Sequence, residues 1–222
     1  MRISVIGILF LVQFIDHCVC LVLPSGASFS STKKPLILLD VDGVINMIGR
    51  NDPHLLWPDS KTKKDVTCNN CLYNIVYSPE MISRINAWNI EGEVQWLTTW
   101  NNDARIRLAP ALGLNDFPVA RNPTTLSKPE TFRKHAENDP NRAIIWIDDE
   151  LLGWKRRVKE EDADDEHKLK YFRKNSAYVS PVRGLLPEQC AFVDEVLKDP
   201  TLLKDKCVDK FEEGSRPGCV IC

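Results

Sequence analysis

The sequence lacks an excess of charge of either sign, an internal repeat and a long apolar segment. Its formal net charge is -2 at pH 7, so a nucleic-acid partner stays open but receives no support from electrostatics. No apolar run reaches the length of about 20 residues that a membrane-spanning helix needs, and the mature chain is expected to have no transmembrane span. Hydrophobic residues at 43% and charged residues at 27% are ordinary globular values. The 222 residues therefore suit one domain with tails.

Cysteines in a zinc-binding arrangement are also scarce. Cys68 and Cys71 form one C-x-x-C pair, and the other, Cys219 and Cys222, lies at the very end of the chain. A zinc site stays open on this spacing, but a loop disulfide or free thiols are favoured. The ending Cys219-Val-Ile-Cys222 also fits a prenylation signal, which would place the protein in the cytosol with a lipid on Cys219.

The N-terminal segment has the features of a secretion signal. Ile3–Ile15 is almost entirely apolar and follows Arg2, which is typical of a signal-peptide core. Residues 1–20 are therefore predicted to be a signal peptide, and 21–34 a Ser-rich linker. The secretory pathway is the expected location, with an organelle-targeting signal or a buried N-terminal element as alternatives. The secretion and prenylation interpretations exclude each other, and we favour secretion.

Two acids directly follow a short apolar run near the start of the domain. Leu36–Leu39 has the composition of a strand buried on both faces of a parallel sheet, and Asp40, Asp42 and Gly43 come next. Carboxylates at the carboxyl end of such a strand lie where open α/β sheets bind ligands. Because two acids so close together repel each other, a divalent cation is the expected companion. The simpler alternative is an Asx-type turn.

Strand and helix signals alternate along the rest of the chain. Further strands are expected at Glu93–Leu97, Phe117–Val119, Ala143–Ile147 and Ala177–Val179. Helices are expected to begin at Ser78-Pro79-Glu80, to cover 104–113 with an interruption at Pro110, to begin at the Ser127–Glu130 capping box, and to cover Pro187–Leu197.

Two stretches show no apolar periodicity. Residues 47–77 are expected to be irregular, with a flap insertion at 51–77, and 155–174 is expected to be a solvated, densely charged helix. The alternation of elements elsewhere predicts an α/β fold, a doubly wound parallel sheet with helices on both faces. The domain is expected to span 35–198, followed by a C-terminal tail at 199–222.

Polar groups at the strand ends and at one helix start occur in a suggestive order. Asp40 with Asp42 comes first, then Thr98, then Lys128, then Asp148 with Asp149. Phosphoryl transfer through an aspartyl-phosphate needs this set. One carboxylate attacks phosphorus, a second transfers protons, and a hydroxyl and an ammonium hold the phosphoryl oxygens. The remaining carboxylates bind Mg²⁺.

In this order the chain resembles the haloacid dehalogenase (HAD) superfamily. Asp40–Asn46 looks like its first motif, Leu97-Thr98 its second, Lys128 its third and Ile147–Asp149 its fourth. A closer likeness is to the HAD domains of bacterial RNA-repair proteins and to short secreted bacterial relatives. It lies in the runs W-L-T-T-W (96–100), L-A-P-A-L-G-L (108–114) and W-I-D-D-E-L (146–151).

The resemblance implies a role for each matching residue. Asp40 would be the nucleophile and Asp42 the general acid and base, while Thr98 and Lys128 would bind phosphate. Asp40, Asp42 through its main-chain carbonyl, and Asp148 would bind Mg²⁺, with Asp149 in support. Neither insertion point of the family has room for a full cap domain, which suggests a capless, HAD-like Rossmannoid fold open to large substrates.

The resulting expectation is a Mg²⁺-dependent phosphatase whose partner is a phosphorylated substrate of unknown identity. Two alternatives are a polynucleotide-end phosphatase acting in nucleic-acid repair and a HAD-fold binding module without catalysis. The intact acids at 40, 42, 148 and 149 count against the second alternative.

Overall fold

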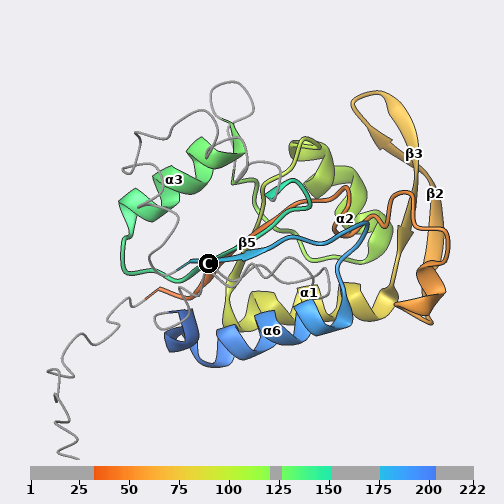
Figure 1. Cartoon of the computed structure of the whole chain (residues 1–222). Coiled ribbons are helices and arrows are strands. Elements are labelled where there is room, and N and C mark those ends of the chain that lie inside the picture. Colours follow the sequence, from red (N-terminus) through yellow and green to blue (C-terminus); the bar gives the residue numbers. More distant parts are fainter. Residues whose placement is uncertain (1–32, 121–126, 152–175, 204–222) are drawn as a thin grey trace, which may run out of the picture.

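The computed structural model of the chain describes residues 33–120, 127–151 and 176–203 (Figure 1). The predicted signal peptide, the linker up to residue 32, the charged segment 155–174 and the tail from residue 204 lie outside the described residues. Among the described helices, none combines the length and the apolarity needed to cross a lipid bilayer.

The centre of the molecule is a parallel sheet of four strands in the order β4-β1-β5-β6. Its strands are β1 (Leu36–Leu39), β4 (Glu93–Trp96), β5 (Ile144–Ile147) and β6 (Ser176–Val179). Every residue of β1, β5 and β6 is buried, which confirms that their apolar runs belong to a sheet covered on both faces. The prediction of a strand at 117–119 was wrong: of these residues, Val119 alone pairs with the sheet, through an isolated bridge to Trp96.

Alternate strand residues face two separate hydrophobic clusters. Ile37 and Leu39 belong to the larger cluster, together with residues of helices α1 (Pro79–Glu91) and α6 (Pro187–Lys198). Leu36 and Leu38 belong to the smaller cluster, with Phe132 of helix α3 (Lys128–Asn138). Figure 1 shows α1 and α6 side by side under the sheet and α3 away from them. The doubly wound arrangement predicted from the sequence is confirmed.

Local capping signals set where two of these helices begin. The Ser78 hydroxyl accepts a hydrogen bond from the Met81 N–H, and Pro79 occupies the first turn of α1. At α3, Ser127 and Glu130 form the predicted capping box, with Glu130 accepting from the Ser127 N–H at 2.7 Å. This cap places Lys128 at the first residue of the helix.

The chain reverses its direction across the sheet after β4. From β1 it passes through α1 to β4 on one side, and then returns through α3 to β5 on the other side of β1. Such a switch point leaves a crevice at the carboxyl ends of the neighbouring strands, where ligands bind in open α/β sheets. The site described below lies at this edge.

The stretch 47–77 is more ordered than predicted. It contains a single 3₁₀ turn, η1 (Pro53–Leu55), and a β-hairpin of β2 (Lys61–Cys68) and β3 (Cys71–Tyr77). The prediction of an irregular stretch was wrong because most of the hairpin is exposed, so its strands carry no apolar alternation. Asn69 and Asn70, both at positive φ, form the turn, and asparagine tolerates that backbone conformation.

Two smaller expectations concern residues in and near the hairpin. The π-helical turn η2 (Ala104–Leu108) continues into α2 (Ala109–Leu112) without the predicted interruption. The Ala109 N–H donates to the Ala104 carbonyl, so the hydrogen-bond ladder is already shifted directly before Pro110, the residue that has no N–H to donate. Cys68 and Cys71 lie opposite each other in the hairpin and are free thiols, which is one of the two states favoured from the sequence. Between β1 and α1, and between β4 and α3, the described residues form these small elements and no cap domain.

Candidate active site at the carboxyl edge of the sheet

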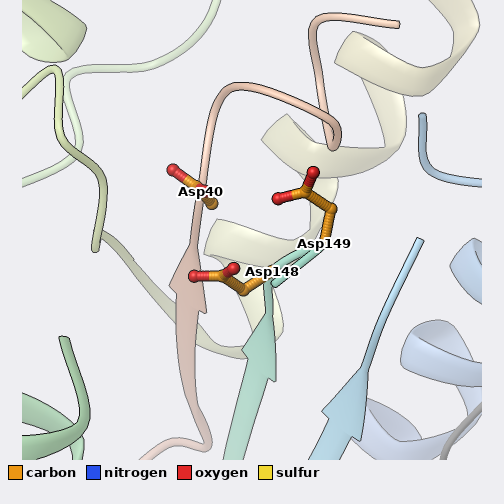
Figure 2. A group of neighbouring side chains, drawn as sticks. All are labelled: Asp40, Asp148 and Asp149. Atoms are coloured by element: carbon orange, nitrogen blue, oxygen red, sulfur yellow. The ribbon is translucent and has the colours of Figure 1, made fainter. Parts of the chain in front are cut away.

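Three carboxylates meet where two adjacent strands end. Asp40 follows β1, and Asp148 and Asp149 follow β5. One carboxylate oxygen from each lies within 4.8 Å of the others, and Figure 2 shows the three side chains around one space. Asp40 and Asp148 are buried, whereas Asp149 is exposed. Acids so close together need protons, a cationic side chain or a bound cation to offset their repulsion.

The sheet itself holds the two buried acids in place. The Asp40 N–H donates to the Ile147 carbonyl at 3.0 Å, and the Asp148 N–H donates to the Val179 carbonyl at 3.0 Å. Both residues thus extend the ladder one position past their strands. Each side chain also accepts a backbone N–H, from Val41 to Asp40 and from Glu150 to Asp148. The acids are therefore fixed by rigid elements rather than by a mobile loop.

Lys128 supplies the positive charge inside this cluster. Its Nζ donates to Asp40 Oδ2 at 2.7 Å and to Asp148 Oδ2 at 2.9 Å, and all three side chains are buried. Lys128 is the first residue of α3, which lies between β4 and β5 in the chain, so it contacts the acids only in the folded protein. With all groups ionised, three carboxylates and one ammonium leave a net charge of -2.

The electrostatics of the cluster shift its pKa values upward. Burial and then the charge of Asp148 raise the pKa of Asp40 to about 6, although Lys128 and a hydrogen bond from Thr98 oppose the shift. Burial and then the charge of Asp40 raise the pKa of Asp149 to about 6, and burial also raises the pKa of Asp148. Burial lowers the pKa of Lys128, but both carboxylates outweigh it and the pKa ends above its usual value.

Gly43 makes room for the exposed acid of the cluster. A Cβ at this position would lie 2.1 Å from Asp149 Oδ2, and the backbone has a φ of +70°. Both the contact and the left-handed conformation therefore require glycine. The turn that follows β1 thus packs its backbone directly against the Asp149 carboxylate.

Two predicted site residues occupy different environments. Thr98, which follows β4 and is fully buried, donates its hydroxyl hydrogen bond to Asp40. Asp42, only two residues after Asp40, lies outside the group of three acids that could share one ion among the described residues. Its Oδ2 accepts from Trp100 Nε1 at 2.8 Å and its Oδ1 from Asn46 Nδ2 at 3.0 Å. A contribution of Asp42 to metal binding stays a prediction.

The structure thus brings together four separate parts of the sequence, namely Asp40, Thr98, Lys128 and the pair Asp148 and Asp149. Sequence reasoning missed Trp100 and Asn46, the two residues that hold Asp42. Both end runs that carry the resemblance, Asp40–Asn46 and 96–100, but a tryptophan after a strand and an asparagine in a turn are also ordinary structural choices, so neither was assigned a role.

The chemistry of the donor set fits a hard divalent cation. Asp40, Asp148 and Asp149 offer only oxygen ligands, which Mg²⁺ and similar ions prefer, and the cluster carries the negative charge that such an ion offsets. Fold and site together define a class: an α/β protein with a Rossmann-like parallel sheet and a candidate metal site at its carboxyl edge. Comparison with models of known families, with curated proteins and with solved structures finds no match for the chain.

Proposed function

We propose that the protein is a Mg²⁺-dependent phosphatase that hydrolyses phosphomonoesters through a phosphoryl group on Asp40. The observation that carries the proposal is the buried Asp40 at the switch point of the sheet, paired with Lys128 at 2.7 Å and within 4.8 Å of Asp148 and Asp149. The order of these residues, which resembles the HAD superfamily, supports the same assignment.

In the first step, an Asp40 carboxylate oxygen attacks phosphorus and the bond from phosphorus to the ester oxygen breaks. Asp42 gives its proton to the departing oxygen, so that an alcohol leaves rather than an alkoxide. Lys128 and Thr98, which both interact with Asp40, would donate hydrogen bonds to the phosphoryl oxygens as the group arrives on Asp40.

In the second step, water attacks phosphorus and the bond to Asp40 breaks, which restores the carboxylate and releases inorganic phosphate. Asp42, now ionised, accepts the proton of the attacking water. Asp40 with its pKa at about 6 is mostly ionised at neutral pH, as a nucleophile must be. A divalent ion on Asp40, Asp148 and Asp149 would supply charge neutralisation between the nucleophile and the substrate.

The surroundings of the site favour a substrate that is not enclosed by a separate domain. The described insertions are the hairpin β2–β3 and the helical turns η2 and α2, all of which pack into the main core cluster. By analogy with other open sites, a large phosphorylated substrate would itself exclude water from the reaction.

A direct test measures phosphate release from para-nitrophenyl phosphate with Mg²⁺ or with EDTA. We expect activity only with the ion, and we expect Asp40→Asn to lower kcat by about 10³-fold or more, since an amide does not attack phosphorus. Asp116→Asn, which alters an exposed carboxylate paired with Arg105, is the matched control and should retain activity. Borohydride treatment of wild-type enzyme quenched during turnover should reduce the phosphorylated aspartate to homoserine, and mass spectrometry should locate this change at position 40.

Two other outcomes would replace the proposal. Activity on oligonucleotide ends far above that on small esters would indicate a polynucleotide-end phosphatase. Binding of phosphorylated ligands without any Mg²⁺-dependent turnover would indicate a binding module. Equal activity of wild type and Asp40→Asn would refute the covalent mechanism.

A further inference from the structure

The Asp42 carboxylate is held at both of its oxygens by donors from separate parts of the chain. Trp100 Nε1 donates to Oδ2 at 2.8 Å, and Asn46 Nδ2 donates to Oδ1 at 3.0 Å. Trp100 follows β4 and is almost fully buried, with 2% of its surface exposed. A carboxylate fixed by two N–H groups keeps one orientation, while each oxygen retains a lone pair for a proton.

Both donors are in turn supported by strand β3 of the hairpin. Asn46 Oδ1 accepts the Val76 N–H at 3.1 Å, which fixes the orientation of the amide so that its NH₂ group faces Asp42. The Trp100 ring packs against the ring of Tyr73, with centroids 5.3 Å apart and a tilt of 48°. One strand therefore orients both groups that hold Asp42.

The hairpin is tied to the body of the protein on either side of these contacts. The Met47 N–H donates to the Val76 carbonyl at 2.8 Å, at the base of β3. At the tip, the Asn69 N–H donates to Asp103 Oδ2 at 2.8 Å, beside the start of η2. A strand fastened at both ends is a rigid support for Trp100 and Asn46.

We propose that Trp100 is a positioning residue for Asp42, and that the hairpin β2–β3 serves the reaction by holding Trp100 in place. The proposal rests on the proposed function, because it gives the orientation of Asp42 a purpose in protonating the leaving oxygen. Proton transfer needs a heavy-atom separation near 3 Å, and a displacement of about 1 Å can cost about 100-fold in rate. The indole N–H therefore acts on the step in which the ester bond breaks.

The dependence on the leaving group separates this role from a merely structural one. Phenyl phosphate and para-nitrophenyl phosphate share one ring, but the nitrophenolate leaves readily without a proton and the phenolate does not. We expect Trp100→Phe, which keeps an aromatic ring beside Tyr73 but removes the N–H, to lower kcat about 10-fold for phenyl phosphate and less than about 2-fold for the nitro compound. An equal loss for both esters, or no loss for either, would overturn the proposal.

Trp88→Phe is the matched control for this substitution. Trp88 Nε1 donates to Asp194 Oδ1 at 2.6 Å, so the same indole-to-carboxylate bond is lost, but between α1 and α6 rather than at the site. The control should lose stability without changing the ratio of the two kcat values. A second pair tests the hairpin, since Tyr73→Ala should shift the ratio in the same direction as Trp100→Phe and Tyr73→Phe should leave it unchanged. An unchanged ratio in Tyr73→Ala would refute the role of the hairpin.

A measurement without substrate decides whether the hydrogen bond exists in solution. In ¹⁵N-labelled protein, the indole N–H resonance that disappears in Trp100→Phe belongs to Trp100, and Asp42→Asn should shift it, because the acceptor changes from a carboxyl oxygen to an amide group. No movement would refute the contact whatever the kinetics show. If the contact is present but wild type hydrolyses neither ester, the proposed function fails and the catalytic purpose of Trp100 fails with it.

Discussion

Replacing Lys128 with methionine tests the charge balance on which the site depends. The substitution keeps most of the side-chain volume and removes the ammonium that lies 2.7 Å from Asp40 and 2.9 Å from Asp148. Among the described residues, the two buried carboxylates then have no cationic partner in a metal-free protein. Breaking a buried ion pair from one side costs about 3–5 kcal/mol, because the remaining charge is left uncompensated.

This free energy translates into a measurable change in Tm. For a chain of this size, 1 kcal/mol corresponds to about 2–4 °C, so Lys128→Met in EDTA at pH 8 should melt about 6–20 °C below wild type. The difference should shrink near pH 5, where protonation of the acids replaces the missing charge. Lys134→Met is the control, since Lys134 is exposed on the same helix, and it should change the Tm little. A Tm for Lys128→Met within 2 °C of wild type at about pH 8 would refute the charge balance described here.

Three further predictions concern metal, pH and the turn after β1. Mg²⁺ at about 100 times its Kd should raise the free energy of unfolding of wild type by about 2.7 kcal/mol, measured by calorimetry. Asp148→Asn should abolish this gain, and a gain that survives in the variant would exclude the site. In EDTA, the folded Asp40 binds its proton more tightly than the unfolded residue, with a pKa of about 6 against 3.8. The contribution of Asp40 to the free energy of unfolding should therefore be fully present below about pH 4 and should fall by about 3 kcal/mol as the pH rises through 6. Urea unfolding measures this free energy, and a rise with pH over the same range would contradict the assignment. Gly43→Ala should displace Asp149 and weaken Mg²⁺ binding about 10-fold or more, measured by titration calorimetry. Gly113→Ala is the control, because Gly113 has a φ of +78° and no atom within 4 Å of an added Cβ, so the substitution should cost only about 1–2 kcal/mol of backbone strain. Equal Mg²⁺ affinity in both variants would show that the Gly43 contact is unimportant.

The local signals of the sequence were sufficient for most of the fold. Runs of apolar residues at Leu36–Leu39 and Ala143–Ile147 predicted buried parallel strands because a strand covered on both faces has no polar side. The Ser78-Pro79 start and the Ser127–Glu130 capping box predicted two helix starts because a cap satisfies backbone N–H groups within a few residues. These signals depend on neighbours in sequence, so they could be read without the structure.

The hairpin β2–β3 could not be predicted from local sequence signals. Its strands are mostly exposed, and its pairing rests on backbone hydrogen bonds and on contacts of Val66 and Ile75 with the main core cluster. Only the Asn69-Asn70 turn marked it locally, and that pair is also common in ordinary loops.

At the site, the sequence determined which acids end the strands, and the tertiary structure decided which of them meet. Asp40 and Asp148 were predictable as neighbours, because parallel strands end at one edge of the sheet. The position of Lys128 between them depends on how α3 crosses the sheet, and the orientation of Asp42 depends on Trp100, 58 residues away. Contacts over such separations arise from packing, and no short stretch of sequence encodes them.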